Sequence, residues 1–230
     1  MGVVNVAEKL RELTGVSNIK AGNDANVAAL GEMKKGGGKG FSDVVMVTLG
    51  TGVGGGIILG GEMLSGNKGA AGEIGHLLVN PDETESCGCG KKGCLEQYAS
   101  ATGIVRMARQ ALRNPVADGL EETMLTDDDK LTAKLVFDCA KDGDKLALEI
   151  IDKFGEYLAV ALAQTAQVID PEVFVIGGGV SAAGQIIIDA VKSRYDKHVL
   201  FALRGKEFRL AELGNDAGIC GCCALVQLNG

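Results

Sequence analysis

The chain has 230 residues, of which 46% are hydrophobic and 23% are charged, proportions typical of a soluble globular protein. A net charge of −7 without a basic block, no tryptophan and only 4% aromatic residues exclude an electrostatic or stacking surface for nucleic acid. No charged segment precedes an apolar run at Met1, and no apolar run is long enough for a bilayer, so we expect a cytoplasmic protein without a membrane partner.

Glycine is the unusual residue in this composition. The chain has 35 glycines, about 15% of its residues and roughly twice the average usage, against only 3 prolines. The glycines follow no three-residue period, which excludes a collagen-like chain. The largest group, 14 of the 35, falls between residues 50 and 93, with smaller groups at 36–38 and 177–179. Because glycine serves both tight turns and close approach of backbone to a ligand, the pattern indicates hairpin turns, ligand-contacting loops, or both.

In chain order, the hydrophobic pattern and the turn residues predict alternating helices and strands. Helices are expected at residues 3–13, 24–35, 100–112, 132–141, 144–169, 183–197 and 217–228. Strands are expected at residues 44–49, 55–59, 62–64, 172–176 and 207–213. Residues 66–94 are expected to be irregular, 118–130 to form an acidic surface loop, and 177–179 to form a turn. Since strands and helices alternate in the second half, the sheet there is expected to be at least partly parallel, and the fold class to be α/β.

The segment Gly50-Thr51-Gly52-Val53-Gly54-Gly55 matches the pattern G-x-G-x-x-G, but its surroundings decide what the match means. A dinucleotide-binding fold needs a helix next, whereas a strand is predicted here. A P-loop needs Gly-Lys-Ser/Thr, and the catalytic motifs of protein kinases are missing from the sequence. What remains is a strand–loop–strand whose backbone N–H groups and Thr51 hydroxyl can hold phosphate oxygens. A plain hairpin turn stays open as the alternative.

Three cysteines form the pattern Cys87-x-Cys89-x4-Cys94. Three thiolates need a fourth ligand to complete a closed tetrahedral zinc site. The chain has only 2 histidines, and one of them, His76, precedes the cysteines across a segment rich in turn residues. The sequence therefore predicts a structural Cys3His zinc site.

The remaining cysteines have a different setting. Cys139 lies on the face of a predicted helix, and Cys220, Cys222 and Cys223 stand among small apolar residues of the last helix. We expect these side chains to fill space in the core, as small hydrophobic residues do. The second histidine, His198, is expected at the surface after the helix at 183–197.

Carboxylates flank the predicted zinc ligands. Glu73 lies three residues before His76, and Glu96 lies two residues after Cys94. A loop held by zinc would bring these two carboxylates and the imidazole together, and such groups suit sugar hydroxyls, which donate and accept hydrogen bonds at once. A solvated surface position is the alternative for each glutamate taken singly.

Asn23 and Asp24 open the predicted helix at 24–35. Their simplest role is to cap its N-terminus. In phosphoryl transfer, however, an aspartate commonly accepts the proton of the acceptor hydroxyl, and a helix dipole keeps a carboxylate at this end ionised. Both roles stay open on this pattern alone.

Together these motifs resemble the ROK family (repressors, open reading frames, sugar kinases), and most of all its bacterial glucokinases. Four stretches occur in the family's order: Asn23-Asp24-Ala25-Asn26, the loop 49–56, Glu73-Ile74-Gly75-His76, and Cys87-Gly88-Cys89-Gly90-Lys91-Lys92-Gly93-Cys94-Leu95-Glu96. The resemblance extends over essentially the whole chain, and the cysteine signature is highly specific.

The resemblance implies an actin-like ATPase (ribonuclease-H-like) α/β fold and ATP-dependent transfer of phosphate to the 6-hydroxyl of glucose. It implies Asp24 as the general base and a sugar site formed by Asn23, Asp24, Glu73, His76 and Glu96. It places Gly50, Thr51 and Gly52 at the ATP phosphates, and Gly177, Gly178 and Gly179 on the adenosine side. It implies structural Zn²⁺ bound by His76, Cys87, Cys89 and Cys94, together with ATP, Mg²⁺ and a homo-oligomer, expected to be a dimer.

One departure from the family is large. The family opens with a strand and an Asp-x-Gly-Gly-Thr turn that grips the ATP phosphates and helps place Mg²⁺, and this sequence contains no such motif. We therefore expect an N-terminally truncated chain with a remnant of the N-terminal lobe at 1–36, a large C-terminal lobe at 37–213 with the zinc loop at 66–96, and a closing helix at 214–230. Phosphoryl transfer, which depends on positioning and electrostatics, is expected to be impaired in the isolated chain.

Two other functions are open. The same polar groups can hold an N-acetylated hexose, which makes an N-acetylmannosamine or N-acetylglucosamine kinase the first alternative. The family also includes sugar-responsive transcriptional repressors with an N-terminal helix-turn-helix, which is the second. The presence of Asp24 favours catalysis over repression.

Overall fold

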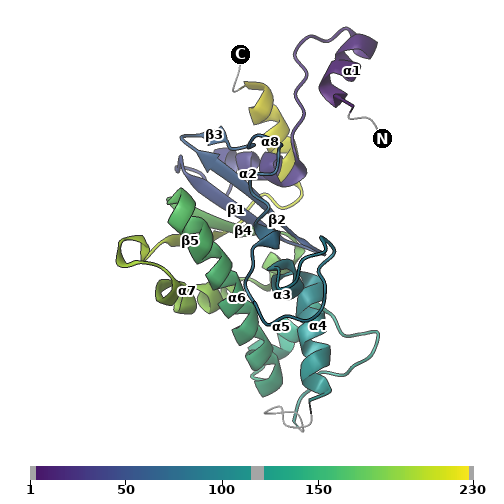
Figure 1. Ribbon diagram of the computed structural model, residues 1–230, viewed down its shortest axis with the longest axis vertical. Helices are drawn as coiled ribbons and strands as arrows, with labels where there is room; N and C mark the ends of the chain where they lie inside the picture. Colours follow the sequence, from purple (N-terminus) through teal and green to yellow (C-terminus); the bar gives the residue numbers. More distant parts are fainter. Residues whose placement is uncertain (1–3, 115–121, 228–230) are drawn as a thin grey trace.

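The structure is a computed structural model that describes residues 4–114 and 122–227. Residue 3 of the first predicted helix, residues 118–121 of the predicted acidic loop and residue 228 of the last predicted helix lie outside the described residues. Within the described part of the chain, a mixed five-stranded sheet carries helices on both faces (Figure 1). This arrangement confirms the predicted α/β class.

The sheet has the strand order β3-β2-β1-β4-β5. Its strands are β1 (Val44–Leu49), β2 (Val53–Leu59), β3 (Glu62–Met63), β4 (Val173–Gly177) and β5 (Glu207–Leu210). The first three pair in antiparallel fashion, whereas β1 pairs in parallel with β4, and β4 with β5. The parallel pairs predicted for the second half are therefore confirmed. The central place of β1 explains why all its residues except Thr48 are apolar, because a strand covered by helices on both faces is buried on both.

The helices follow the predicted order closely. The α-helices are α1 (Val6–Thr14), α2 (Asp24–Lys35), α3 (Glu96–Ala99), α4 (Ala101–Leu112), α5 (Ala133–Lys141), α6 (Lys145–Ile169), α7 (Gln185–His198) and α8 (Asp216–Gln227). The 3-10 turns are η1 (Ile74–His76), η2 (Gly179–Ala183) and η3 (Phe201–Leu203). Helix α3 and the 3-10 turns were not predicted, because elements of three to five residues are too short to show a hydrophobic period.

Two boundaries differ near the glycine segments. Strand β2 begins at Val53 rather than at residue 55, because Val53 and Gly54 continue the antiparallel ladder opposite Leu49 and Thr48. The turn predicted at 177–179 shortens to Gly178, which has a φ of 84°, since the residues on either side belong to β4 and η2.

Glu32 is a fully buried carboxylate in α2, and its hydrogen bonds explain where strand β5 ends. Its Oε2 accepts hydrogen bonds from the amides of Gly37 at 2.8 Å and Glu212 at 3.1 Å, and its Oε1 accepts one from Leu213 at 2.9 Å. These bonds turn the amides of residues 212 and 213 toward α2. Strand β5, predicted to reach residue 213, therefore ends at Leu210.

The two faces of the sheet are covered by different helices (Figure 1). On one face, Val44 and Met46 of β1 join a small core with residues of α2 and α8. On the other face, Val45 and Val47 join the larger core formed with residues of α3, α4, α5, α6 and α7. Successive residues of β1 thus point to opposite layers, as the period of a strand requires.

Glycines in β2 let helix α2 approach the sheet closely. A Cβ atom on Gly56 would lie 2.5 Å from the Cβ of Ala29, and one on Gly54 would lie 3.2 Å from the Cβ of Ala25. Both separations are shorter than ordinary van der Waals contacts, so a larger residue would push the helix away. The close fit brings the N-terminus of α2, with Asp24, next to the loop that joins β1 to β2.

Helix α8 packs against α2 through small residues. Its buried positions are Ala217, Gly221 and Ala224, and a Cβ on Gly221 would lie 1.8 Å from the carbonyl oxygen of Val27. This face excludes the three cysteines of the helix, because they lie between the positions that contact α2.

The expectation that Cys220, Cys222 and Cys223 fill the core is therefore wrong: Cys222 and Cys223 are exposed, and Cys220 is half-buried. Cys139 on α5 is buried, as expected. His198 ends α7 and is half-buried rather than at the open surface, because its Nε2 lies 2.7 Å from a carboxylate oxygen of Glu156.

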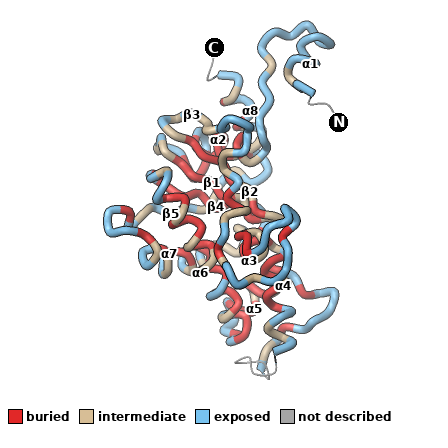
Figure 2. The backbone as a smooth tube through the Cα atoms, viewed as in Figure 1, coloured by how far each residue is buried: buried red, intermediate tan, exposed pale blue. Residues whose placement is uncertain are grey.

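Helix α1 stands apart from the two layers. None of its residues is buried, and Figure 2 shows the helix and the segment after it exposed almost throughout. Helix α2, by contrast, packs on both β2 and α8. The predicted division of the chain at residue 36 stays a prediction.

In the part of the chain that the structure describes, no helix has the length and apolar character needed to cross a bilayer.

Candidate functional site

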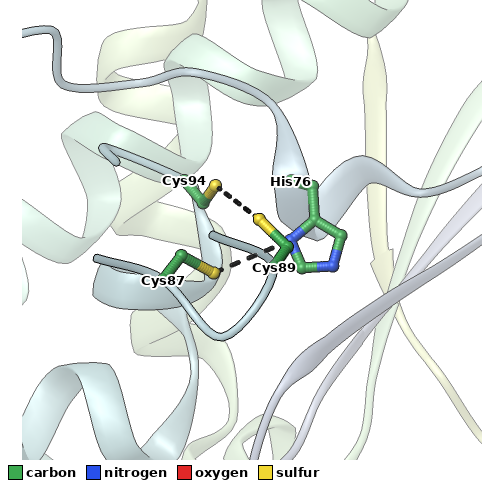
Figure 3. A group of neighbouring side chains, drawn as sticks. All are labelled: His76, Cys87, Cys89 and Cys94. Carbon is green, nitrogen blue, oxygen red and sulfur yellow. Dashed lines mark hydrogen bonds between the residues drawn. The ribbon is translucent and has the colours of Figure 1, made fainter. Parts of the chain in front are cut away.

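The four predicted zinc ligands lie together (Figure 3). His76 Nδ1 lies 3.8 Å from Cys87 Sγ, Cys89 Sγ lies 3.6 Å from Cys94 Sγ, and all four ligand atoms fall within 4.8 Å of one another. A tetrahedral site with Zn–S bonds of about 2.3 Å has ligand–ligand separations of roughly 3.7 Å. Both the donor set and the spacing therefore fit a structural zinc ion.

The ligand cluster is assembled by an irregular segment that is held by isolated bridges and by polar side-chain contacts. Isolated bridges join Leu78 to Cys94 and Ser86 to Lys92. Lys91 donates from Nζ to the carbonyl oxygen of His76 at 2.9 Å, which holds the two ends of the loop together. Loops of this kind gain much of their order from the metal they bind.

The thiols of the cluster differ in acidity. A hydrogen bond from the Lys91 amide lowers the pKa of Cys89, whereas burial raises the pKa of Cys94 to about 12. Zinc binds thiolates, so a zinc ion bound here would displace protons from the cysteines.

Residues 50–52, between β1 and β2, form a loop that we call the glycine loop. Asp24 is the first residue of α2, and it lies exposed beside this loop. The preceding Asn23 caps the helix, because its side-chain oxygen accepts hydrogen bonds from the amides of Ala25 at 3.0 Å and Asn26 at 3.2 Å. Asp24 accepts only from the adjacent Ala25 amide, at 2.8 Å through Oδ1. The capping role thus belongs to Asn23, and the second carboxylate oxygen of Asp24 is left for a ligand.

Glu96 joins the zinc cluster to the glycine loop. Its Oε1 lies 3.8 Å from Cys87 Sγ, and its Oε2 accepts a hydrogen bond from the Val53 amide at 3.1 Å. A Cβ on Gly52 would lie 2.4 Å from the same Oε2, which accounts for glycine at that position. Glu96 is therefore a bridge between two segments as well as a polar group facing a cavity.

A cavity of about 320 Å³ brings the acidic groups to the glycine loop. It is lined by Asp24, Ala25, Thr48, Gly50, Gly52, Val53, Gly54, Glu96 and Gly178. Asp24 and Glu96, which are far apart in the sequence, thus face one space. Of the other residues predicted to bind sugar, the described lining contains neither Asn23 nor Glu73 nor His76. Glu73 is exposed at the start of η1, and His76 turns its Nδ1 to the cysteines.

A second cavity, of about 470 Å³, adjoins the first. It is lined by Gly50, Thr51, Ala101, Thr132, Ala133, Lys134, Phe137, Asp138, Gly179, Val180, Ala182 and Ala183. Gly50 lines both cavities, and Gly178 and Gly179 line one each. Gly177 lines neither, because it is a buried end of β4. The second cavity is mainly apolar, with the polar Thr51 at its junction with the first.

Two amides of the glycine loop are already engaged within the protein. The Gly50 amide donates to the Gly52 carbonyl at 2.9 Å, and the Val53 amide donates to Glu96. The amides of Thr51 and Gly52 and the Thr51 hydroxyl are the donors of this loop that point to a ligand role. Sequence reasoning singled out these residues but did not separate them from Gly50.

Sequence reasoning missed the α5 side of the second cavity. Thr132, Ala133, Lys134 and Phe137 carried no motif, and α5 was predicted only as a helix. Lys134 and Asp138, which pair on the same helix, would be read as an ordinary surface ion pair. Only the packing of α5 across from η2 brings these residues to the glycine loop.

The comparisons with known proteins agree with one another. The family model described as ROK family matches residues 3–229. A glucokinase from Halalkalibacterium halodurans is 47% identical over 224 residues, covering 96% of this chain and 66% of the relative. The chain thus spans about two thirds of the length of this curated relative.

Solved structures give the same result. A ROK family glucokinase from Streptomyces griseus, in complex with glucose and AMPPNP, aligns with a TM-score of 0.79 at 34% identity, covering 97% of this chain and 72% of that one. A ROK hexokinase from Thermus thermophilus aligns with a TM-score of 0.80 at 32% identity, covering 97% and 69%. These likenesses and the strand order confirm the expected actin-like, ribonuclease-H-like fold.

Proposed function

The chain belongs to the ROK family, and from this premise we propose that the protein is a glucokinase, transferring phosphate from ATP to the 6-hydroxyl of glucose. The observation that carries the proposal is the pair of adjoining cavities. A polar cavity holding Asp24 and Glu96 meets a larger apolar one at Gly50, which lines both, and the adjacent Thr51 lines the larger one. A sugar and a nucleotide bound in them would meet at the glycine loop.

Asp24 is proposed as the general base. Its carboxylate lies at the N-terminus of α2, where the helix dipole interacts favourably with negative charge. An ionised carboxylate facing the cavity can accept the proton of the sugar 6-hydroxyl as phosphate is transferred. Glu96 is proposed to accept from a second sugar hydroxyl through its cavity-facing oxygens. Asn23, Glu73 and His76 are proposed to complete the sugar site from its rim.

The nucleotide is proposed to bind across the second cavity. Adenosine suits the apolar wall formed by Phe137, Val180 and Ala183, with Gly177, Gly178 and Gly179 on that side. The phosphates would then lie at the junction, within reach of Gly50, Thr51 and Gly52. Mg²⁺ is proposed to enter with ATP, and it neutralises phosphate charge during transfer.

We propose structural Zn²⁺ on His76, Cys87, Cys89 and Cys94. These residues form a complete set of four ligands, which leaves no open position for catalysis. The cluster's role is then to hold the segment that carries Glu73, His76 and Glu96. A homodimer and a cytoplasmic location are part of the same proposal, and sedimentation of the purified protein tests the first.

The test is a coupled assay of ADP release with ATP, Mg²⁺ and a panel of glucose, N-acetylmannosamine and N-acetylglucosamine. It is run on this chain and on any longer product of its reading frame. Glucose is expected to give the highest kcat/KM. A preference for an N-acetylated sugar would show that glucose is not the main substrate. No ADP above background with any of the three sugars would refute the proposed kinase activity.

The role of Asp24 is tested by Asp24→Asn, which removes the base but keeps the shape of the side chain. Loss of a general base lowers kcat by about 10²–10⁴-fold. The matched control is Asp142→Asn, an exposed aspartate at the end of α5. Equal activity in the two variants would contradict the assignment.

A further inference from the structure

The corner between α3 and α4 contacts the glycine loop through bonds that the proposed sugar and nucleotide contacts do not use. The Ala101 amide donates to the Gly50 carbonyl at 2.8 Å, and the Thr102 hydroxyl donates to the Thr51 carbonyl at 2.9 Å. With the bond from the Val53 amide to Glu96, three consecutive parts of the loop are attached to one short stretch of chain.

The start of α4 explains why these bonds form. The first amides of a helix have no partner within the helix. Ser100 caps α4 by accepting from the Gly103 amide at 2.9 Å, and the Ala101 amide is satisfied by the loop. The Gly50 carbonyl thus serves as an external cap of α4, so the loop and the helix end order each other.

The corner between α3 and α4 is itself held by hydrogen bonds to residues outside the glycine loop. Ser100 donates from Oγ to the Glu96 carbonyl at 2.6 Å, which fixes α3 against α4. Tyr98 on α3 is only 4% exposed, and its hydroxyl donates to Glu83 at 2.5 Å and accepts from Asn80 at 2.8 Å. The corner therefore has little freedom to follow the loop if the loop moves.

Thr102 is the one side chain that extends from the corner to the carbonyl of the proposed phosphate-binding residue. A bond to the Thr51 carbonyl sets the orientation of the peptide that follows, and that peptide carries the Gly52 amide. Its removal leaves the Thr51–Gly52 peptide free to rotate, while the Ala101 and Glu96 bonds keep the loop in place. The expected defect is thus in orientation rather than in folding.

We propose that Thr102 is a positioning residue that orients the Thr51–Gly52 peptide for the nucleotide phosphates. The phosphate contact rests on the proposed function, whereas the hydrogen bond to the loop does not. Thr102 touches neither the sugar cavity nor the apolar cavity by its own side chain, and it acts through Thr51.

The test compares Thr102→Val with Thr102→Ser. Valine keeps the β-branched shape and removes the hydroxyl, whereas serine keeps the hydroxyl. Hydrogen exchange of the peptide covering residues 50–53 is measured by mass spectrometry. Loss of the Thr102 bond makes local opening of the loop more frequent. Because opening exposes the bonded amides of Gly50 and Val53, their exchange is expected to be about five-fold faster in the valine variant. The serine variant is expected to stay near the parent, and both are expected to keep the parent's zinc content.

Kinetics supply the second readout. Thr102→Val is expected to raise KM for ATP about five-fold, with less effect on KM for glucose, and Thr102→Ser is expected to restore the parent value. A merely structural role would change both KM values together or neither.

Unchanged exchange at residues 50–53 in Thr102→Val would overturn the proposal, whether or not the protein phosphorylates a sugar. Faster exchange with an unchanged KM for ATP would overturn the role in nucleotide binding. Faster exchange in a protein that phosphorylates no sugar at all would support the hold on the loop and refute the proposed function, so the two failures are distinguishable.

Discussion

The two sides of the glycine loop are held by different forces. On the α2 side, Asp24 is placed by close packing of α2 on glycines of β2 and on α8, with the buried Glu32 tying the helix to backbone amides. On the opposite side, Glu96 is placed by polar contacts of an irregular segment and by the four grouped zinc ligands.

This difference indicates which of the two carboxylates, Asp24 or Glu96, depends on pH and metal supply for its position. Packing and buried backbone bonds do not change with pH near neutrality or with metal supply. Zinc ligation by thiolates depends on both, because the metal binds only the deprotonated cysteines. We therefore expect Asp24, the proposed base, to keep its place in the absence of zinc, while Glu96 and the segment 66–96 would lose theirs.

Removal of a proposed zinc ligand is expected to disturb only the Glu96 side of the glycine loop. Cys89→Ser is expected to release the bound zinc and to speed hydrogen exchange across residues 66–96. Structural zinc contributes on the order of 10 kcal/mol to sites of this kind, so this is the largest effect we expect. Metal content by mass spectrometry checks it, with the exposed Cys222→Ser as control. Stoichiometric zinc in Cys89→Ser would contradict the site.

Glu32→Ala is expected to disturb the α2 side of the glycine loop. It leaves one buried and two partly buried amides without their acceptor. A buried unpaired amide costs about 1–3 kcal/mol and a partly buried one less, so the free energy of unfolding is expected to fall by about 4 kcal/mol. Urea denaturation measures the loss. Glu62→Ala, on the exposed β3, is the control and is expected to change stability by less than about 0.5 kcal/mol. Equal losses in the two variants would show that the Glu32 bonds do not hold α2.

The packing of α8 on α2 can be tested within one helix. Gly221→Ala would place a Cβ 1.8 Å from the Val27 carbonyl oxygen, and we expect a loss of about 3 kcal/mol from overpacking. Gly218 faces open space on the same helix, so Gly218→Ala is expected to stabilise by about 0.5–1 kcal/mol through helix propensity. Thermal unfolding of the pair gives the comparison, and a stable Gly221→Ala would mean that the helices are farther apart than the structure has them.

Acid is expected to loosen the second side through Glu83. Burial alone would raise the pKa of this carboxyl, but hydrogen bonds from Arg106 and Tyr98 outweigh it and lower the pKa to about 2. Since the folded pKa is below the unfolded one, the stabilisation is present above about pH 4.5 and is lost as the pH falls toward 2.

The contribution of Glu83 is about 1–2 kcal/mol, the smallest effect in this series. Urea unfolding of the parent and of Glu83→Gln from pH 6 to pH 3 measures it: the two stabilities should converge as the pH falls. Glu85→Gln is the matched control, because Glu85 pairs with the same Arg106 but is exposed. Parallel curves for the parent and Glu83→Gln would contradict the assignment.

The zinc ligands could be predicted from sequence because their chemistry is rare and three of them are close in the chain. Few arrangements other than a metal site account for Cys87, Cys89 and Cys94 with one histidine upstream. The strands and long helices could be predicted for a related reason: their hydrophobic periods are local properties of the sequence.

The cysteines of α8 show where such reasoning fails. Composition alone suggested that Cys220, Cys222 and Cys223 are buried, but the face that packs on α2 is made of Ala217, Gly221 and Ala224. Which side of a helix is buried depends on its partner, and α8, which is apolar around most of its circumference, has no polar face to mark the exposed side.

The sequence by itself determined the order of the strands and long helices, the four residues proposed to bind zinc, and the motifs that resemble a sugar kinase. Only the tertiary structure decided that Asp24 and Glu96 share a cavity and that residues of α5 line the cavity next to it. It also decided that the Gly50 amide is hydrogen-bonded within the loop. Spacing along the chain records local geometry, whereas cavities arise where segments distant in sequence meet through packing, and that meeting depends on every contact in the fold at once.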